Sequence, residues 1–200
     1  MKNKTKDQST EEKILVAARK VFTKKGFAAT RTRDIAEESG INLALLNYYF
    51  KSKELLFEAV MVEKIAMLFG QLMPVLLETD LSFNKKVELV VERYIDMLLE
   101  NPDLPIFVMS ELRNHPDRFL EKMPVDVILR ESHFIRQIQE KHPDQNPIQY
   151  LMSTLGMVIF PFVMKPVFTK IGKTDEKGFK AMMKERKKLI PKWVEAIMEI

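Results

Sequence analysis

Hydrophobic residues recur at helical spacing along almost the whole chain, and no run alternates between apolar and polar residues as a β-strand would. The first apolar stripe consists of Ile14, Ala17, Ala18, Val21 and Phe22. Ser9, followed three residues later by Glu12, is typical of a capping box at the start of this helix, and Gly26 is expected to end it. The pattern therefore predicts an all-α protein.

Several more helices are expected after the first. They are predicted over residues 33–39, 43–50, 53–73, 87–101, 104–114, 116–141, 148–168 and 175–200. Proline lacks a backbone N–H and disturbs the preceding turn, so Pro161 and Pro166 are expected to bend or break the helix that contains them. Pro191 argues against an unbroken last helix. The expected total is about nine helices.

Composition narrows the class of protein further. Cysteine is absent from the 200 residues, which excludes disulfide frameworks, thiolate zinc sites and thiol nucleophiles. The first ten residues, MKNKTKDQST, lack the apolar segment of a signal peptide. The longest nearly apolar run, residues 151–164, is too short to span a bilayer. We therefore expect a soluble cytoplasmic protein without a membrane partner.

Charge is distributed unevenly along the chain. Residues 1–53 contain 12 of the 32 basic residues and 6 of the 28 acidic residues, which gives this segment a net charge of +6. The other 147 residues carry a net charge of −2. A basic segment attached to a mildly acidic body indicates a module that binds a polyanion such as DNA. For Lys2, Lys4 and Lys6 taken alone, a solubilising tail explains the charge equally well.

Residues 32–51 have the pattern of a helix-turn-helix motif. Ala36 is the small residue needed where two helices cross, and Gly40 tolerates the positive φ of the turn. The apolar contacts are provided by Ile35, Ile41, Leu46 and Tyr49. The second helix of such a motif enters the major groove of DNA. Helical proteins that do not bind DNA also contain Ala and Gly at this spacing, so the motif alone leaves both interpretations open.

The segment from Ile14 to Val60 resembles the N-terminal domain of the tetracycline-repressor (TetR) family. The resemblance is carried by Ile-Leu-x-Ala-Ala from Ile14, Phe22, Gly26-Phe27, Thr30-x-Thr32, Ile35-Ala36, Gly40-Ile41 and Tyr49-Phe50-Lys51-Ser52-Lys53-Glu54-x-Leu56. It implies a three-helix DNA-binding domain over residues 8–68, joined by a continuous helix to a helical ligand-binding and dimerisation domain over residues 69–200. It further implies a homodimeric one-component regulator, usually a repressor, that binds a palindromic operator in double-stranded DNA.

The same resemblance implies which residues contact DNA. The candidates are Thr30, Arg31, Thr32, Arg33, Asn42, Leu43, Ala44, Asn47, Tyr48, Tyr49 and Lys53. Thr30 and Lys53 correspond to positions that contact phosphate, and Arg31 or Arg33 to one that reaches a base. Asn47 stands where many family members carry Tyr, and an Asn side chain can pair with the edge of adenine.

Methionine and phenylalanine are abundant in the part of the chain that follows the motif. An adaptable apolar cavity lined by such residues would bind an apolar or amphipathic small molecule that releases the DNA. The candidate lining residues are Phe69, Met73, Met97, Phe107, Phe119, Phe134 and Met157. Ordinary core packing explains each of these residues equally well. The last two helices are expected to pack against their symmetry mates in the dimer.

Two other functional classes stay open as alternatives. The first 60 residues could bind protein rather than DNA, as a helical interaction module. An all-α hydrolase or a di-metal bundle would need paired Glu-x-x-His spacings or a complete nucleophile triad, and the sequence contains neither. His115, His133 and His142 are too scattered for a ligand triad. The sequence thus indicates no catalytic residue, no metal site and no cofactor.

Overall fold

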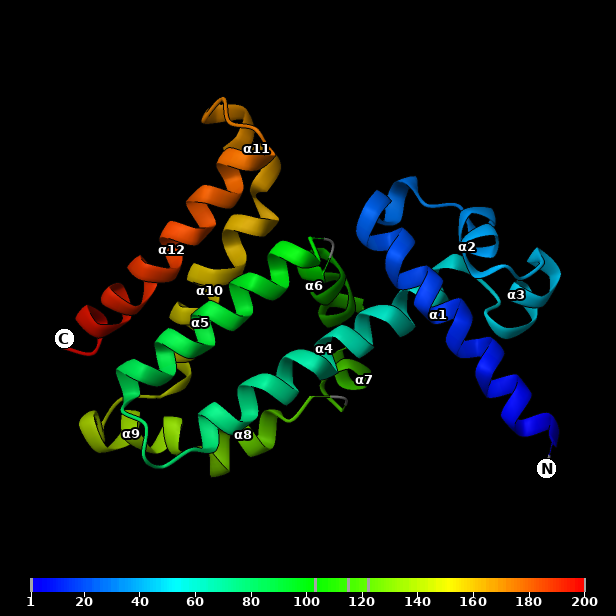
Figure 1. Ribbon diagram of the computed structural model, residues 1–200. Coiled ribbons are helices and arrows are strands. Elements are labelled where there is room, and N and C mark those ends of the chain that lie inside the picture. The colour runs from blue at the N-terminus through cyan, green and yellow to red at the C-terminus, as the bar shows by residue number, and fades with distance from the viewer. Residues whose placement is uncertain (1, 103, 115, 122, 200) are drawn as a thin grey trace. The chain divides into compact units, whose positions relative to one another are not determined.

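In the part of the chain that the computed structural model describes, all regular elements are helices joined by turns and loops (Figure 1). That part comprises residues 2–102, 104–114, 116–121 and 123–199, with side chains except those of residues 2–9, 111, 118 and 119. Its helices are α1 (Lys2–Ala29), α2 (Thr32–Ser39), α3 (Leu43–Tyr49), α4 (Lys53–Leu77), α5 (Phe83–Glu100), α6 (Leu104–Asn114), α7 (Pro116–Leu120), α8 (Val125–Glu131), α9 (His133–Lys141), α10 (Ile148–Val163), α11 (Lys165–Ile171) and α12 (Glu176–Ile197). The predicted all-α class is confirmed, with twelve helices over these residues rather than about nine.

Two compact units divide the chain within α4. The first reaches to Ala66 and includes Asn101 and Pro102, and the second begins at Met67 and contains the remaining helices. The sequence placed the domain boundary between residues 68 and 69 and did not predict that residues 101 and 102 belong with the first unit. Helix α4 runs through this boundary without a break.

The first unit is built around buried residues from its four helices. Ile14, Ile35, Leu46 and Leu56, one from each of α1 to α4, are fully buried. An aromatic cluster adds to this core where α1 and α4 meet. The Phe57 ring lies 5.0 Å from the Phe22 ring and 4.7 Å from the Phe27 ring, measured between centroids. Arg19 on α1 also forms an ion pair with Glu63 on α4, with 3.1 Å between nitrogen and oxygen.

The start and end of α1 differ from the prediction. The helix already begins at Lys2, so Ser9 lies within it and the predicted capping box is wrong. Gly26 does interrupt the helix, with φ at 74° and ψ at 168°, and a further short helical segment follows it to Ala29. A positive φ is readily adopted by glycine because it lacks a Cβ atom. The interruption redirects the chain just before the turn that leads to α2.

In the second unit, α5, α10 and α12 pack together. Val87, Val91 and Ile95 on α5 recur at helical spacing and are buried, as are Ile190 and Val194 on α12. The helices predicted over residues 87–101 and 175–200 are present as α5 and α12. Two apolar stripes bury each other when their helices pack side by side.

The predicted helix over residues 116–141 is wrong, because the chain forms three shorter helices there. Pro124 stands at the N-terminus of α8, and Ser132 lies between α8 and α9. The Ser132 hydroxyl accepts a hydrogen bond from the Ile135 backbone N–H at 3.3 Å and donates one to the Ile128 carbonyl at 2.5 Å. Serine commonly begins a helix in this way. His115 lies outside the described residues.

The prolines affect the C-terminal helices less than predicted. Helix α10 continues through Pro161, and α12 continues through Pro191. Pro161 leaves the Met157 carbonyl without its usual donor four residues on, and an Arg186 N–H group from α12 donates to that carbonyl at 2.7 Å. The chain instead bends by 66° between α10 and α11, close to Pro166. A tertiary hydrogen bond thus compensates for one proline.

Helix α4 is long and apolar enough to cross a membrane, and so are α10 and α11 together if the bent pair forms one span. The expectation that every apolar segment is too short does not hold for α4 by these criteria. Core helices of soluble proteins meet the same criteria. Leu68, Leu72 and Val75 on α4 are buried, as expected for a core helix.

A buried lysine in the second unit should make stability depend on pH. Lys86 on α5 is fully buried, and its Nζ lies 2.8 Å from His133 Nδ1. Burial lowers the pKa of Lys86, while the charge of Glu78 acts in the opposite direction. Between the lowered folded pKa and the ordinary value of 10.5, the unfolded chain holds more protons than the folded protein. The free energy of unfolding therefore gains a favourable contribution from Lys86 as the pH rises through this window.

We expect Lys86→Met to remove that gain. Urea unfolding of both proteins at several pH values between 7 and 10.5 measures it. The stability of the wild type, relative to that of the variant, should increase with pH. All other residues are the same in both proteins, so the difference reports on Lys86. A difference that is constant over the whole range would contradict the prediction.

Candidate nucleic-acid interface

The turn between α2 and α3 has the geometry of a helix-turn-helix motif. Gly40 follows α2 with φ at 67° and ψ at 21°, which is the left-handed conformation expected of it. The Ile41 N–H donates to the Ala36 carbonyl at 3.1 Å and closes the end of α2. Ala36 itself is buried. The predicted roles of Ala36 as the small buried residue and of Gly40 as the turn residue are confirmed.

The start of α2 is held by a hydrogen-bonded carboxylate. The backbone N–H of Arg31 donates to Asp34 Oδ2 at 2.9 Å, and the Asp34 N–H donates to the Arg31 carbonyl at 3.0 Å. The Lys25 ammonium lies 3.1 Å from the same carboxylate. The bond from Arg31, followed by that from Lys25, lowers the pKa of Asp34. These bonds use the backbone of Arg31, whose side chain is exposed, as is that of Arg33.

Helix α3 presents a polar and aromatic face to solvent. Asn42 begins it, and its Oδ1 accepts a hydrogen bond from the Leu45 N–H at 2.7 Å. Leu46 is fully buried and anchors the helix, while Ala44, Asn47 and Tyr48 are exposed. The Tyr48 side chain is 76% exposed and stands edge-to-face against Tyr49, with the ring centroids 5.4 Å apart. These three exposed side chains are accessible to a partner.

Comparison with known proteins identifies this arrangement. Residues 14–60 match the family model described as bacterial regulatory proteins, tetR family. This match covers α2, the turn and α3, together with most of α1 and the first part of α4. Residues 14–60 are thus a TetR-type N-terminal domain.

Several proteins of known sequence or structure are similar to this chain. The HTH-type transcriptional repressor KstR2 of Mycolicibacterium smegmatis is 31% identical over 134 residues, which cover 60% of this chain and 63% of that repressor. The fatty acid degradation regulator FadR of Bacillus halodurans has the same fold, with a TM-score of 0.62 at 17% identity over 90% of this chain and 93% of that one. FadR of Bacillus subtilis, solved in complex with stearoyl-CoA, has a TM-score of 0.56 at 16% identity over 90% and 96%.

The match to curated relatives is partial. The chain spans less than two thirds of the length of the relatives it matches, namely 63% of KstR2, 27% of the regulator YttP of Bacillus subtilis and 39% of the regulator YerO of the same species. The likeness to solved structures, at less than 25% identity, concerns the fold.

Some of the residues predicted to contact DNA do not lie on the surface of the domain. Thr30 is buried, and its hydroxyl donates to the Gly26 carbonyl at 2.7 Å. Lys53 is half-buried, and its ammonium donates to the carbonyls of Phe27 and Thr30. Both side chains are bonded within the domain and do not belong to the exposed face. Thr32, Leu43 and Tyr49 are half-buried.

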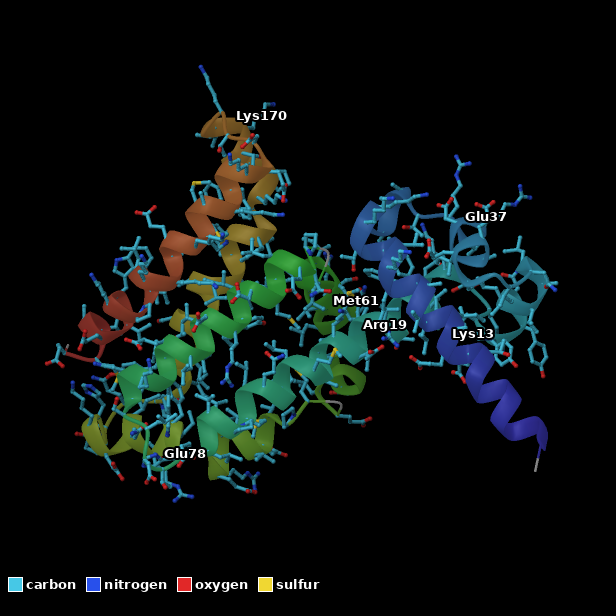
Figure 2. The ribbon with its side chains drawn as sticks, viewed as in Figure 1. Lys13, Arg19, Glu37, Met61, Glu78 and Lys170 are labelled. Carbon is cyan, nitrogen blue, oxygen red and sulfur yellow. The ribbon has the colours of Figure 1, made fainter. Side chains whose placement is uncertain are left out.

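One exposed basic residue next to α3 was not among the DNA-contacting candidates predicted from the sequence. Lys51 follows α3 and is exposed. Its position inside the quoted TetR motif was a signal that could have identified it. Glu37 is also exposed, near the C-terminal end of α2, and Figure 2 labels it there. The basic side chains of Arg31 and Arg33 instead lie at the N-terminal end of α2, where the helix dipole also favours an anion.

None of the seven candidate pocket residues lines either of the two hollows described in the next paragraph. Phe107 and Phe134 are buried in the second unit, and Phe134 stacks on Phe83 with 5.0 Å between ring centroids. The side chain of Phe119 lies outside the described residues. The remaining four, Phe69, Met73, Met97 and Met157, are half-buried. The predicted ligand pocket stays a prediction.

Two hollows elsewhere in the described part of the chain differ greatly in size. One, in the first unit, has a volume of about 10 Å³ and is lined by Phe22, Thr23, Phe57, Met61, Asn101 and Pro102. A volume of that size holds a single water molecule. The other is an open groove of about 690 Å³ between α5 and α12, with lysine and glutamate side chains along it. Its charged walls do not fit an apolar ligand.

Proposed function

We propose that this protein is a cytoplasmic, one-component regulator of transcription that binds double-stranded DNA, most often as a repressor. The observation that carries the proposal is the exposed face of α3, where Asn47 and Tyr48 project from a helix anchored by Leu46. The second helix of a helix-turn-helix motif reads base edges in the major groove. Exposed Arg31, Arg33 and Lys51 supply positive charge for the phosphates.

An apolar surface on the second unit supports a homodimer. The exposed stripe consists of Ile148, Met152 and Leu155 on α10 and Met182 and Trp193 on α12. The first three recur at spacings of four and three residues and therefore share one face of α10. α10 and α12 pack against each other. Large exposed apolar patches of this kind mark interfaces, and two-fold symmetry would let the same stripe cover itself in a second copy.

Dimerisation follows from how such motifs read DNA. A single recognition helix contacts only a few base pairs, whereas a two-fold dimer reads both halves of a palindromic operator, about 34–36 Å apart. Each complex would therefore contain two copies of α3, one in each half of the operator. For this reason we assign the exposed stripe to a second copy of the chain.

The effector is proposed only by its chemical class. The density of Met and Phe in the second unit favours an apolar or amphipathic small molecule. Bacillus subtilis FadR, which shares the fold, was solved with the amphipathic ligand stearoyl-CoA.

Selection of binding sites from a random duplex DNA library tests the function. We expect enrichment of a palindrome, and binding to it should weaken linearly with the logarithm of the salt concentration, with a slope of about −0.9 for each phosphate contacted. A helical module that binds protein would enrich no sequence and bind no duplex. That outcome would refute the proposed function.

A further inference from the structure

The ammonium group of Lys53 holds together the turn that precedes α2. Lys53 is the first residue of α4, and its Nζ donates to the Phe27 carbonyl at 3.1 Å and to the Thr30 carbonyl at 3.2 Å. The same Nζ lies 4.1 Å from the centroid of the Phe27 ring, so a cation–π contact accompanies the two bonds. Two of the three N–H groups of this ammonium are therefore used inside the domain.

The turn needs such a donor because the helix is interrupted there. Gly26 leaves the helical conformation, and the carbonyls that follow it lose regular partners four residues on. The Thr30 hydroxyl returns to the Gly26 carbonyl at 2.7 Å, and the Thr30 N–H donates to the Phe27 carbonyl at 3.3 Å. The contacts from Lys53 complete this set of bonds from a helix that is more than twenty residues further along the chain.

One peptide group links Lys53 to the candidate DNA contacts. The carbonyl of Thr30 and the N–H of Arg31 belong to the same planar peptide group. Its carbonyl accepts from Lys53, and its N–H donates to the Asp34 carboxylate that begins α2. Fixing both ends of this group fixes the direction in which α2 starts and the position of the Arg31 side chain.

We propose that Lys53 is a positioning residue for DNA binding and acts through Arg31, not a residue that contacts phosphate. This inference rests on the proposed function. It departs from what the family resemblance implies for this lysine. A phosphate contact and a positioning role make different predictions, because only a positioning residue depends on Arg31 for its effect.

A double-mutant cycle distinguishes the two roles. Affinity for a selected duplex is measured for the wild type, Lys53→Met, Arg31→Ala and the double variant at one salt concentration. Lys53→Met should weaken binding about tenfold in the wild-type background and less than threefold when Arg31 is already Ala. Lys53→Arg, whose guanidinium can still donate to both carbonyls, should recover most of the affinity. Lys51→Ala is the matched control, because Lys51 is exposed, and its effect should be the same with or without Arg31.

Three results would overturn the inference. Equal losses for Lys53→Met in both backgrounds would make Lys53 a direct phosphate contact. Unchanged affinity with a lowered melting temperature would make it a purely structural residue. If Lys53→Arg folds but does not restore binding, the bonds to the two carbonyls are not the reason why Lys53→Met loses affinity.

A readout without DNA separates this inference from the proposed function. Hydrogen exchange at the Arg31 amide should be faster in Lys53→Met than in the wild type, while exchange at the Leu46 amide in α3 stays unchanged. If the wild type binds no duplex, the proposed function fails, and this exchange comparison still tests whether Lys53 fixes the peptide group. Equal exchange at Arg31 in the two proteins would refute that role.

Discussion

Replacing Leu155 by Arg is expected to make the protein monomeric and to lower its affinity for a full operator by about 100-fold or more. Leu155 is 41% exposed and stands in the exposed stripe of α10 and α12. In the proposed dimer an arginine there would be buried without a partner, and its symmetry mate would bring a second positive charge close by. A monomer engages one half-site and loses the gain from binding two sites at once.

Sedimentation velocity measures the oligomeric state, and titration of full and half operators measures the loss of avidity. Ile106→Arg is the matched control, because Ile106 on α6 is an equally apolar residue, 55% exposed, outside the stripe. That variant should remain a dimer and bind the full operator normally. A Leu155→Arg protein that still sediments as a dimer would place the interface elsewhere on the second unit.

Replacing Tyr48 by Ala is expected to weaken operator binding by roughly tenfold, within the ~1–3 kcal/mol that one recognition contact contributes. Tyr48 is 76% exposed on α3, so its removal should change the free energy of unfolding by no more than ~0.5 kcal/mol. The loss therefore reports on contact with DNA rather than on folding.

Two neighbouring residues on α3 provide the controls. Leu45, 37% exposed, is not among the candidate contacts, so Leu45→Ala should leave both DNA affinity and stability nearly unchanged. Leu46 is fully buried, and Leu46→Ala should lower the free energy of unfolding by about 2–5 kcal/mol. Anisotropy titrations and urea unfolding measure the two effects separately. Normal DNA affinity of the Tyr48→Ala protein would exclude this face of α3 as the recognition surface.

Local features of the amino-acid sequence determined the fold class and the DNA-binding motif. Gly40 could be assigned to the turn because a left-handed conformation depends on the residue itself. Ala36 and Leu46 could be assigned to the interior because their spacing places them on the inner faces of two short helices. The TetR resemblance of residues 14–60 added which residues are expected to contact DNA.

Interactions between residues far apart in the chain were decided only by the tertiary structure. Lys53 is turned inward because carbonyls at the interrupted end of α1 accept its hydrogen bonds, and no spacing rule predicts a partner 26 residues away. Helix α10 continues through Pro161 because Arg186, 29 residues from Met157, supplies the missing donor. Sequence periodicity reports which face of a helix is apolar, but a single side chain that satisfies a distant backbone group leaves no periodic signal.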